Sequence, residues 1–257
     1  MNGDSQIVQE LPKIFDEIRD DVVKVVGAGV VCYLTYKVFR YVYIRRYVGA
    51  IRQENKEILE KQTENIEKLI QESGLSNQEL ENIVQLEWDD LVSRLQAGSL
   101  SSTAVLRAYQ HAAVQVNTKT NSIVRYLQCA EDTVKKLDQL RPEERGPFHG
   151  VPFSIKECYN VKNTPSTAGC VMFSRIMDKE DCPLVTMIKS LGGVPFCKTN
   201  VPQQMMSLQC SNPIYGTTCN PHSRDDDPRE CGGSSGGEGA LIGGEKYNHI
   251  FYYLWPT

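Results

Sequence analysis

The chain of 257 residues is long enough for one large domain or two modest ones, and 40% of its residues are hydrophobic. Its 28 Lys and Arg residues and 32 Asp and Glu residues give a formal net charge of −4, which argues against a nucleic-acid partner. The nine cysteines form no Cys-x-x-Cys pair, so neither a zinc site nor a thioredoxin-type motif is expected, and no metal or cofactor is predicted. An odd number of cysteines without a secretory signature fits reduced thiols in a cytosol-facing domain.

An apolar segment at residues 22–44 follows an N-terminal segment of residues 1–21. Lys24 and Lys37 interrupt it, and the uncharged stretch between them, residues 25–36, is shorter than the roughly 20 residues that cross a bilayer. Lysine side chains that reach toward the headgroups at both ends would extend this stretch to a spanning helix. Three interpretations remain open: a transmembrane helix, an interfacial basic amphipathic helix and a core helix of a soluble domain.

Charged residues flank this apolar segment unequally. Arg40, Arg45 and Arg46 lie toward its C-terminal side, whereas Asp20 and Asp21 precede it. Positive charge accumulates on the cytoplasmic side of membrane-spanning helices. The main domain is therefore expected to face the cytoplasm.

Residues 45–75 are expected to form a helical connector to that domain. Isoleucine and leucine recur along one stripe of residues 51–72, and Gly74 is expected to end the helix. This pattern fits either a short coiled-coil stalk or a solvated helix that lies on the domain.

Two further helices are expected to open the main domain. Ser76 and Glu79 form a capping box at the start of the first helix, which is expected to run to Gly98. The second helix covers about residues 102–116. Apolar residues are expected to face inward in both: Leu80, Ile83, Val84, Trp88, Leu91, Val92 and Leu95 in the first, and Leu106, Tyr109, Ala113 and Val116 in the second.

Strand and helix patterns alternate in the central region. Residues 151–155 and 194–198 are apolar and β-prone, and residues 183–191 between them read as a helix with a proline in its first turn. This order predicts a strand–helix–strand unit and hence a largely parallel α/β sheet.

Two segments in this region carry residues suited to chemistry. Lys156 follows the first strand directly, and a lysine desolvated at the end of a buried strand has a lowered pKa and can act as a general base. A solvated lysine at a strand end is the alternative. Residues Cys231–Gly243 place Ser234 and Ser235 among glycines, which allow close backbone approach to a substrate. A flexible linker is the alternative there, and the apolar residues that follow the serines weigh against it.

Together with residues 200–203 and 210–213, these two segments resemble the amidase signature family, and within it most of all the membrane-bound fatty acid amide hydrolases. The resemblance extends over about residues 86–243. It implies an α/β amidase-signature fold with a mixed, largely parallel sheet covered by helices. Residues 76–243 would form the N-terminal half of that domain, preceded by the N-terminal membrane helix.

The resemblance also implies a mechanism and a set of site residues. A neutral Lys156 takes a proton from Ser234, which the family holds in a cis peptide bond, and Ser234 in turn activates a separate nucleophilic serine that attacks the amide carbonyl. Ser235 supports Ser234 by hydrogen bonding. Met205 matches a substrate-binding position near the carbonyl, so Met205, Ser234 and Ser235 are expected to contact the substrate.

The sequence departs from the family pattern after Gly243. The family nucleophile lies in a later Asp-Ile-Gly-Gly-Ser motif, but residues 244–257 contain no serine and are rich in aromatic side chains. We therefore expect a chain that ends before its nucleophile and is inactive alone. The divergent tail fits either a segment that contacts a partner or a membrane, or an alternative or misannotated end of the chain.

Two classes of function follow from these expectations. The first is a fatty acid amide hydrolase-like enzyme, which hydrolyses lipid amides to a fatty acid and an amine, present here in a truncated form. The second is a non-catalytic membrane-associated protein that associates with a full-length amidase, with a dimer as one form of that association. Both classes place the protein at a membrane, with an endomembrane as the expected location.

Overall fold

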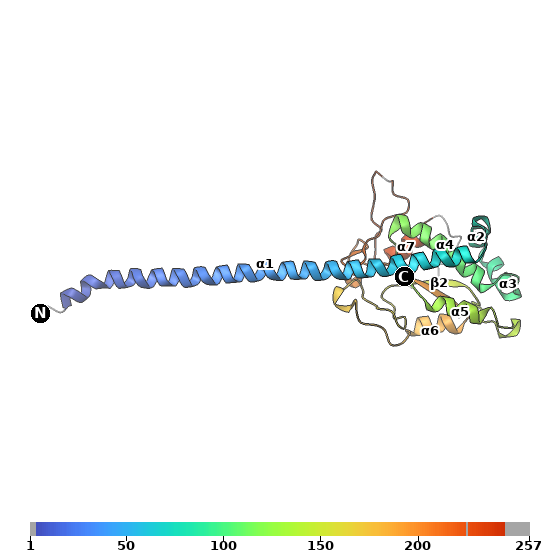
Figure 1. Ribbon diagram of the computed structural model, residues 1–257, viewed down its shortest axis with the longest axis horizontal. Coiled ribbons are helices and arrows are strands. Elements are labelled where there is room, and N and C mark those ends of the chain that lie inside the picture. The colour runs from blue at the N-terminus through green and yellow to red at the C-terminus, as the bar shows by residue number, and fades with distance from the viewer. Residues whose placement is uncertain (1–3, 225, 245–257) are drawn as a thin grey trace. The chain divides into compact units, whose positions relative to one another are not determined.

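The computed structural model describes residues 4–224 and 226–244, with side chains placed from Arg19 onward (Figure 1). The chain divides into two compact units, Met1–Gly49 and Ala50–Thr257. Helix α1 (Asp4–Glu72) contributes to both. The expected aromatic tail lies outside the described residues, except for Gly244.

The first unit consists, in its described part, of the N-terminal portion of α1. Helical structure already covers residues 4–21, ahead of the apolar segment. Among the described residues, one helix is long and apolar enough to cross a membrane: it is described over Arg19–Glu72, and its most apolar 18 residues have a mean hydropathy of 1.6 with none of them buried. Exposed apolar side chains such as Val25 (72% exposed) and Phe39 (73%) count against the core-helix interpretation.

The second unit begins with the remainder of α1, which buries Ile51 and Ile66. As expected, the helix ends just before Gly74, which adopts a positive φ of +71° that favours glycine. The capping box of the next helix is also confirmed, because the Ser76 backbone N–H donates to Glu79 at 2.8 Å and the Glu79 N–H donates back to the Ser76 hydroxyl at 3.3 Å.

The helix expected from Ser76 to Gly98 is in fact two helices, α2 (Asn77–Val84) and α3 (Trp88–Ala97). The break falls at Glu87, whose extended backbone begins a new helix with Asp89 and Asp90 in its first turn. Acidic side chains stabilise a helix N-terminus through the helix dipole, which favours a start at this point. The apolar face nevertheless stays buried on both sides of the break, at Leu80, Ile83, Val84, Leu91 and Leu95.

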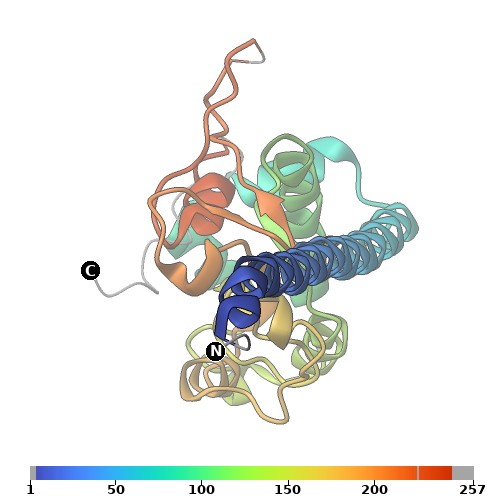
Figure 2. The same ribbon diagram turned by 90° about the vertical axis from the view of Figure 1, so that its left-hand side faces the viewer.

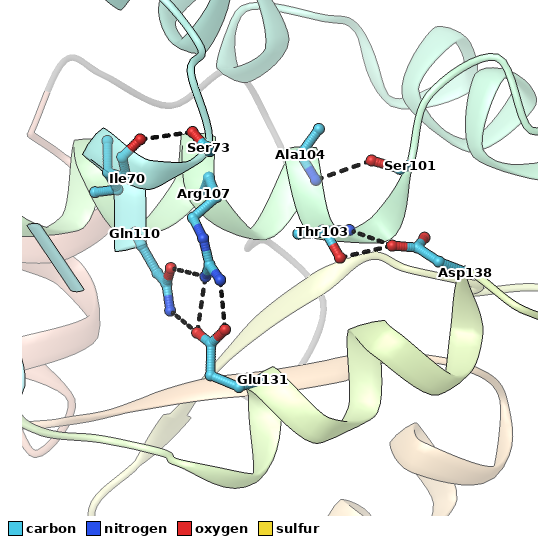
Figure 3. A network of polar contacts seen from close by, with 9 residues as sticks. All are labelled: Ile70, Ser73, Ser101, Thr103, Ala104, Arg107, Gln110, Glu131 and Asp138. Carbon is cyan, nitrogen blue, oxygen red and sulfur yellow. Dashed lines mark hydrogen bonds and ion pairs between the residues drawn. The ribbon is translucent and has the colours of Figure 1, made fainter. Parts of the chain in front are cut away.

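Helix α4 (Ser102–Thr120) and helix α5 (Cys129–Leu137) are joined by two polar clusters, shown in Figure 3. Asp138 accepts hydrogen bonds from the backbone N–H groups of Ser102 and Thr103 at 2.6 and 3.1 Å, and so caps the start of α4. Farther along, Arg107 binds Glu131 through both terminal nitrogens at 2.8 and 2.6 Å. Such paired bonds fix the two helices relative to each other.

The central sheet has the strand order β1-β3-β2, with β1 at Ile123–Tyr126, β2 at Pro152–Lys156 and β3 at Val194–Thr199. Strands β2 and β3 are parallel and are connected through α6 (Pro183–Ser190), which confirms the expected strand–helix–strand unit. The sheet is less parallel than expected, because β1 pairs antiparallel with β3. The four residues of β1 are too few to show a strand pattern in the sequence.

The remaining elements are short. Strands β4 (Ser211–Asn212) and β5 (Gly216–Thr217) form an antiparallel hairpin, and α7 (Gly236–Ile242) follows the glycine-rich loop. The described residues of the polar loop, 220–224 and 226–230, extend away from the rest of the second unit (Figure 2). Three short 3-10 helices complete the described elements: η1 (Pro142–Glu144), η2 (Val171–Phe173) and η3 (Gln203–Met205).

The core of the second unit lies between the sheet and the helices that cover it. Fully buried side chains from α4, β3 and α7 meet there, including Tyr109, Phe196 and Leu241. Each large apolar side chain stabilises the fold by roughly 1.5–3 kcal/mol when it is fully buried. The core therefore seats α7, and the loop before it, firmly against the carboxyl ends of β2 and β3.

Candidate active site

Lys156 is the last residue of β2 and is only 4% exposed. Because side chains alternate along a strand, Ser154 lies on the same face as Lys156, and Thr199 lies directly opposite Lys156 in the register with β3. Burial lowers the pKa of Lys156, against the opposing effect of nearby acidic groups. The expected burial of this lysine is thus observed, and the interpretation as a solvated lysine is wrong.

Ser234 lies beside this lysine. The Lys156 Nζ donates a hydrogen bond to the Ser234 Oγ at 3.1 Å, over a separation of 78 residues in sequence. Ser234 is half-buried and precedes the first turn of α7. The structure therefore brings together the two residues that the resemblance assigns to proton transfer.

Gly236 and Gly237, which follow the two serines, are buried and closely packed. A Cβ at Gly236 would collide with the Cβ of Cys210, and a Cβ at Gly237 would collide with the backbone of Asn200. The Gly233 N–H donates to the Leu208 carbonyl at 2.8 Å, and Gly233 has a φ of +78°. The loop needs glycine for close approach and for this turn, so the linker interpretation is not supported.

The peptide bonds of this loop differ from what the resemblance implies. Every peptide bond between described residues is trans, so the cis bond expected at Ser234 is not present in this structure. The chain instead changes direction at Gly233, which adopts a left-handed backbone conformation. The hydrogen bond between Lys156 and Ser234 is made with this all-trans geometry.

Glu238 completes the cluster, although the sequence analysis did not single it out. Its carboxylate accepts a hydrogen bond from the Ser154 hydroxyl at 2.7 Å and another from the Thr199 hydroxyl at 2.9 Å. Burial raises the pKa of the Glu238 carboxyl, and the two hydroxyl donors and Lys156 oppose that rise. The signal available in the sequence was that Glu238 is the sole charged residue between Cys231 and Gly243.

A second buried lysine and glutamate lie on the other face of the same strand ends. Lys198 is fully buried, and its ammonium donates to the Pro165 carbonyl at 2.8 Å and to the Ser166 hydroxyl at 2.9 Å. Burial lowers the pKa of Lys198 to about 8. Glu157 is also fully buried and accepts hydrogen bonds from the Thr167 and Ala168 N–H groups at 2.7 and 2.9 Å. These contacts hold the loop of residues 164–168 against the carboxyl ends of β2 and β3.

The other expected substrate-binding residues flank the glycine-rich loop. Met205 lies in η3 and is 36% exposed, and its segment reaches the loop through an isolated bridge between Gln209 and Gly232. Ser235 occupies the position before α7, where its carbonyl accepts from the Gly239 N–H at 2.9 Å. The contacts of both residues with a substrate remain predictions.

This arrangement is suited to proton transfer. A lysine held at low solvent exposure is more readily neutral than an exposed one, and a neutral amine accepts a proton from a hydroxyl within hydrogen-bonding distance. Within residues 4–224 and 226–244, no group of three or more His, Cys, Asp and Glu side chains is placed to hold a metal ion. The Lys156 amine and the Ser234 hydroxyl are within hydrogen-bonding distance of each other.

Comparison with known proteins gives a consistent result. The family profile described as Amidase matches residues 104–247. Fatty acid amide hydrolase 1 of Caenorhabditis elegans is 40% identical over 196 residues, which are 75% of this chain and 33% of that protein. Fatty-acid amide hydrolase 1 of Sus scrofa is 40% identical over 181 residues, which are 70% of this chain and 30% of that protein.

A solved structure of fatty acid amide hydrolase has the same fold over most of this chain. The TM-score is 0.64 at 27% identity, and the match covers 79% of this chain and 38% of that chain. The chain thus spans about a third of the length of the relatives it matches. Since the family profile covers more than half of the sequence, the chain belongs to the amidase family.

Proposed function

We propose that this chain carries the proton-relay part of a fatty acid amide hydrolase-like site. The observation that supports this most directly is the hydrogen bond of 3.1 Å between the Lys156 Nζ and the Ser234 Oγ at the end of a buried strand. The substrate class is a lipid amide, hydrolysed to a fatty acid and an amine. The similarity to two fatty acid amide hydrolases at 40% identity supports that substrate class.

In the proposed relay, a neutral Lys156 accepts the hydroxyl proton of Ser234. Ser234 takes a proton in turn from the attacking serine, and Lys156 then returns its proton through Ser234 to the departing amine. The attacking serine belongs to the family's Asp-Ile-Gly-Gly-Ser motif, which the sequence of residues 1–257 does not contain. We therefore propose that this polypeptide, tested alone, does not hydrolyse amides. Loss of one oxyanion-hole donor by itself lowers the rate of acyl-transfer enzymes by about 10²–10³.

Membrane attachment through α1 is part of the proposal. The exposed apolar stretch of that helix has the length and composition to cross a bilayer, and its exposed valines and tyrosines would otherwise contact water. Arginines after the stretch favour a cytoplasmic position for the second unit, with an endomembrane as the proposed location.

A second candidate function is a non-catalytic, membrane-associated protein that binds a full-length amidase. Exposed apolar side chains on two loops of the second unit favour it. Met172 is 74% exposed, Met206 is 85% exposed and Leu208 is 89% exposed. Large exposed apolar side chains of this kind are candidates for contact with a protein partner.

A fluorophosphonate probe and an oleamide assay separate these proposals from an active enzyme. The purified 257-residue polypeptide, in detergent or nanodiscs, is expected to show no adduct at Ser234 or Ser235 and no release of oleic acid. Ser234→Ala serves as the matched control, since its signal should equal that of the unmodified chain. An adduct at either serine that disappears in its alanine variant would contradict the proposed relay role. Pull-down of a full-length amidase in the same detergent would support the second candidate.

A further inference from the structure

Glu238 occupies a particular place in the cluster. It lies four residues after Ser234, in the first turn of α7, and each of its carboxylate oxygens binds a different strand of the sheet. Ser154 of β2 binds Oε2, and Thr199 of β3 binds Oε1. One side chain therefore ties the helix that follows the serine to both strands that flank the lysine.

The register of the sheet shows why these two hydroxyls matter. Ser154 is two residues before Lys156 on the same strand and so shares its face, and Thr199 is the register partner of Lys156 on β3. The hydroxyls that hold Glu238 thus lie beside and opposite the lysine. A displacement of the Glu238 carboxylate would therefore move α7 relative to Lys156.

Backbone packing sets the same helix against β3. The Gly237 N–H donates to the Asn200 carbonyl at 3.1 Å, directly after the end of that strand. Among the hydrogen bonds of the described residues, the bond to Lys156 is the one that links the Ser234 side chain to a strand. The position of Ser234 therefore depends on how α7 is seated.

We propose that Glu238 is a positioning residue, which clamps α7 onto β2 and β3 and thereby holds Ser234 within hydrogen-bonding distance of Lys156. The proposal rests on the assignment of Lys156 as the base. Glu238 is also the carboxylate among the titratable groups that face Lys156, and its charge opposes the effect of burial on the pKa of that lysine. It therefore tunes how readily Lys156 gives up its own proton.

The titratable groups around the pair are few. Those that face Lys156 are Cys158 after β2, Cys210 before β4 and Glu238 on α7, and those that face Glu238 are Lys156 and Cys197 of β3. Burial raises the pKa of all three thiols and so disfavours their ionised forms. Both carboxylate oxygens of Glu238 accept a hydrogen bond from a hydroxyl group, as an ionised carboxylate does. Its charge raises the pKa of Lys156 against the larger effect of burial.

The first test measures how fast an acylating reagent modifies Lys156 as the pH is raised, by mass spectrometry of the full chain in nanodiscs. Glu238→Gln keeps the shape of the side chain and removes its charge. The pH at which acylation of Lys156 reaches half its maximal rate (the midpoint) is therefore expected to decrease. Glu157→Gln is the matched control. It makes the same change at a buried carboxylate adjacent to Lys156 in sequence, whose contacts are to Thr167 and Ala168 instead, and the midpoint is expected to stay in place.

The second test needs no change at Glu238. Thr199→Val removes one hydroxyl donor but keeps the shape of the side chain, and it is expected to increase hydrogen exchange in a peptide covering residues 232–242. Ser190→Ala, on the outer helix α6, is the control and should leave that peptide unchanged. The proposal is overturned if the pH midpoint of Lys156 acylation does not move in folded Glu238→Gln. It is also overturned if hydrogen exchange of residues 232–242 does not change in Thr199→Val. An ordinary lysine midpoint in the unmodified chain would instead refute the assignment of Lys156 as the base.

Discussion

Two glycines of α7 offer a paired test of how this helix is seated. Gly237 and Gly239 lie two residues apart in the same helix, and neither has a positive φ that would itself require glycine. A Cβ at Gly237 would meet the backbone N, O and Cα of Asn200, whereas a Cβ at Gly239 would meet nothing within 4 Å. The same substitution to alanine should therefore have opposite effects at the two positions.

The magnitudes follow from what surrounds each site. Asn200 is fully buried, and its backbone N–H is bonded to the Ser122 carbonyl at 2.8 Å, so it has little freedom to move away from an added methyl group. Overpacking of this kind costs about 1–3 kcal/mol. At Gly239 the helix propensity of alanine would instead contribute up to about 1 kcal/mol of stability. The free energies of unfolding of the two variants should thus differ by about 1–4 kcal/mol.

Thermal unfolding followed by near-ultraviolet circular dichroism is the suitable assay. The long helix α1 dominates the far-ultraviolet signal, whereas aromatic side chains such as Tyr109 and Trp88 report on the packing of the second unit. For a chain of this size, 1 kcal/mol corresponds to about 2–4 °C in Tm. Gly237→Ala should unfold at a clearly lower temperature than Gly239→Ala. Equal Tm values, or a lower Tm for Gly239→Ala, would refute the reasoning about close approach.

Three further predictions concern buried charges and a helix cap. Arg107→Met leaves the Glu131 carboxylate without its two guanidinium donors, and the free energy of unfolding in urea should fall by about 3–5 kcal/mol. Burial acts to raise the pKa of Glu131, but hydrogen bonding outweighs it and lowers that pKa. The stability advantage of the native chain over Glu131→Gln should therefore shrink as the pH falls below the ordinary value of 4.5. Burial lowers the pKa of Lys198 from 10.5 to about 8, so the unfolded state binds more protons than the native state between these two pH values. As the pH rises through that window, the native chain should gain stability relative to Lys198→Met, by at most about 3 kcal/mol. A stability difference between the two chains that stays constant across the window would contradict this. Asp138→Ala removes two of the hydrogen bonds that cap the start of α4 and leaves the one between Ser101 and Ala104. It should lower stability by about 1–2 kcal/mol, whereas an unchanged urea midpoint would show that water replaces the Asp138 carboxylate.

Much of the fold could be predicted because its signals are local. Ser76 and Glu79 are spaced as a capping box, Gly74 follows the helix end, and the alternation of strand and helix around α6 gives the parallel pair. The break between α2 and α3 was missed, because the apolar face continues through it and only the acidic first turn of α3 marks a new start. Strand β1 is formed by pairing with β3, a long-range contact that four residues do not reveal.

The candidate site shows the same division. Lys156 and Ser234 were found through motifs, and the structure places them in contact. Glu238, Lys198 and Glu157 were missed, since each is identified by partners that lie 10 to 84 residues away in sequence. Burial of a charged side chain depends on the tertiary fold, and composition or spacing along the chain does not report it.

The proposed proton relay requires that Lys156 loses its proton more readily than an ordinary lysine beside Ser234. A titration of its side-chain nitrogen by NMR, in the native chain labelled with ¹⁵N-lysine and assigned with Lys156→Met, tests this most directly. Lys156 should titrate with a midpoint below that of an ordinary lysine, and this midpoint should change on Ser234→Ala. A midpoint at the ordinary value of 10.5, insensitive to Ser234, would contradict it.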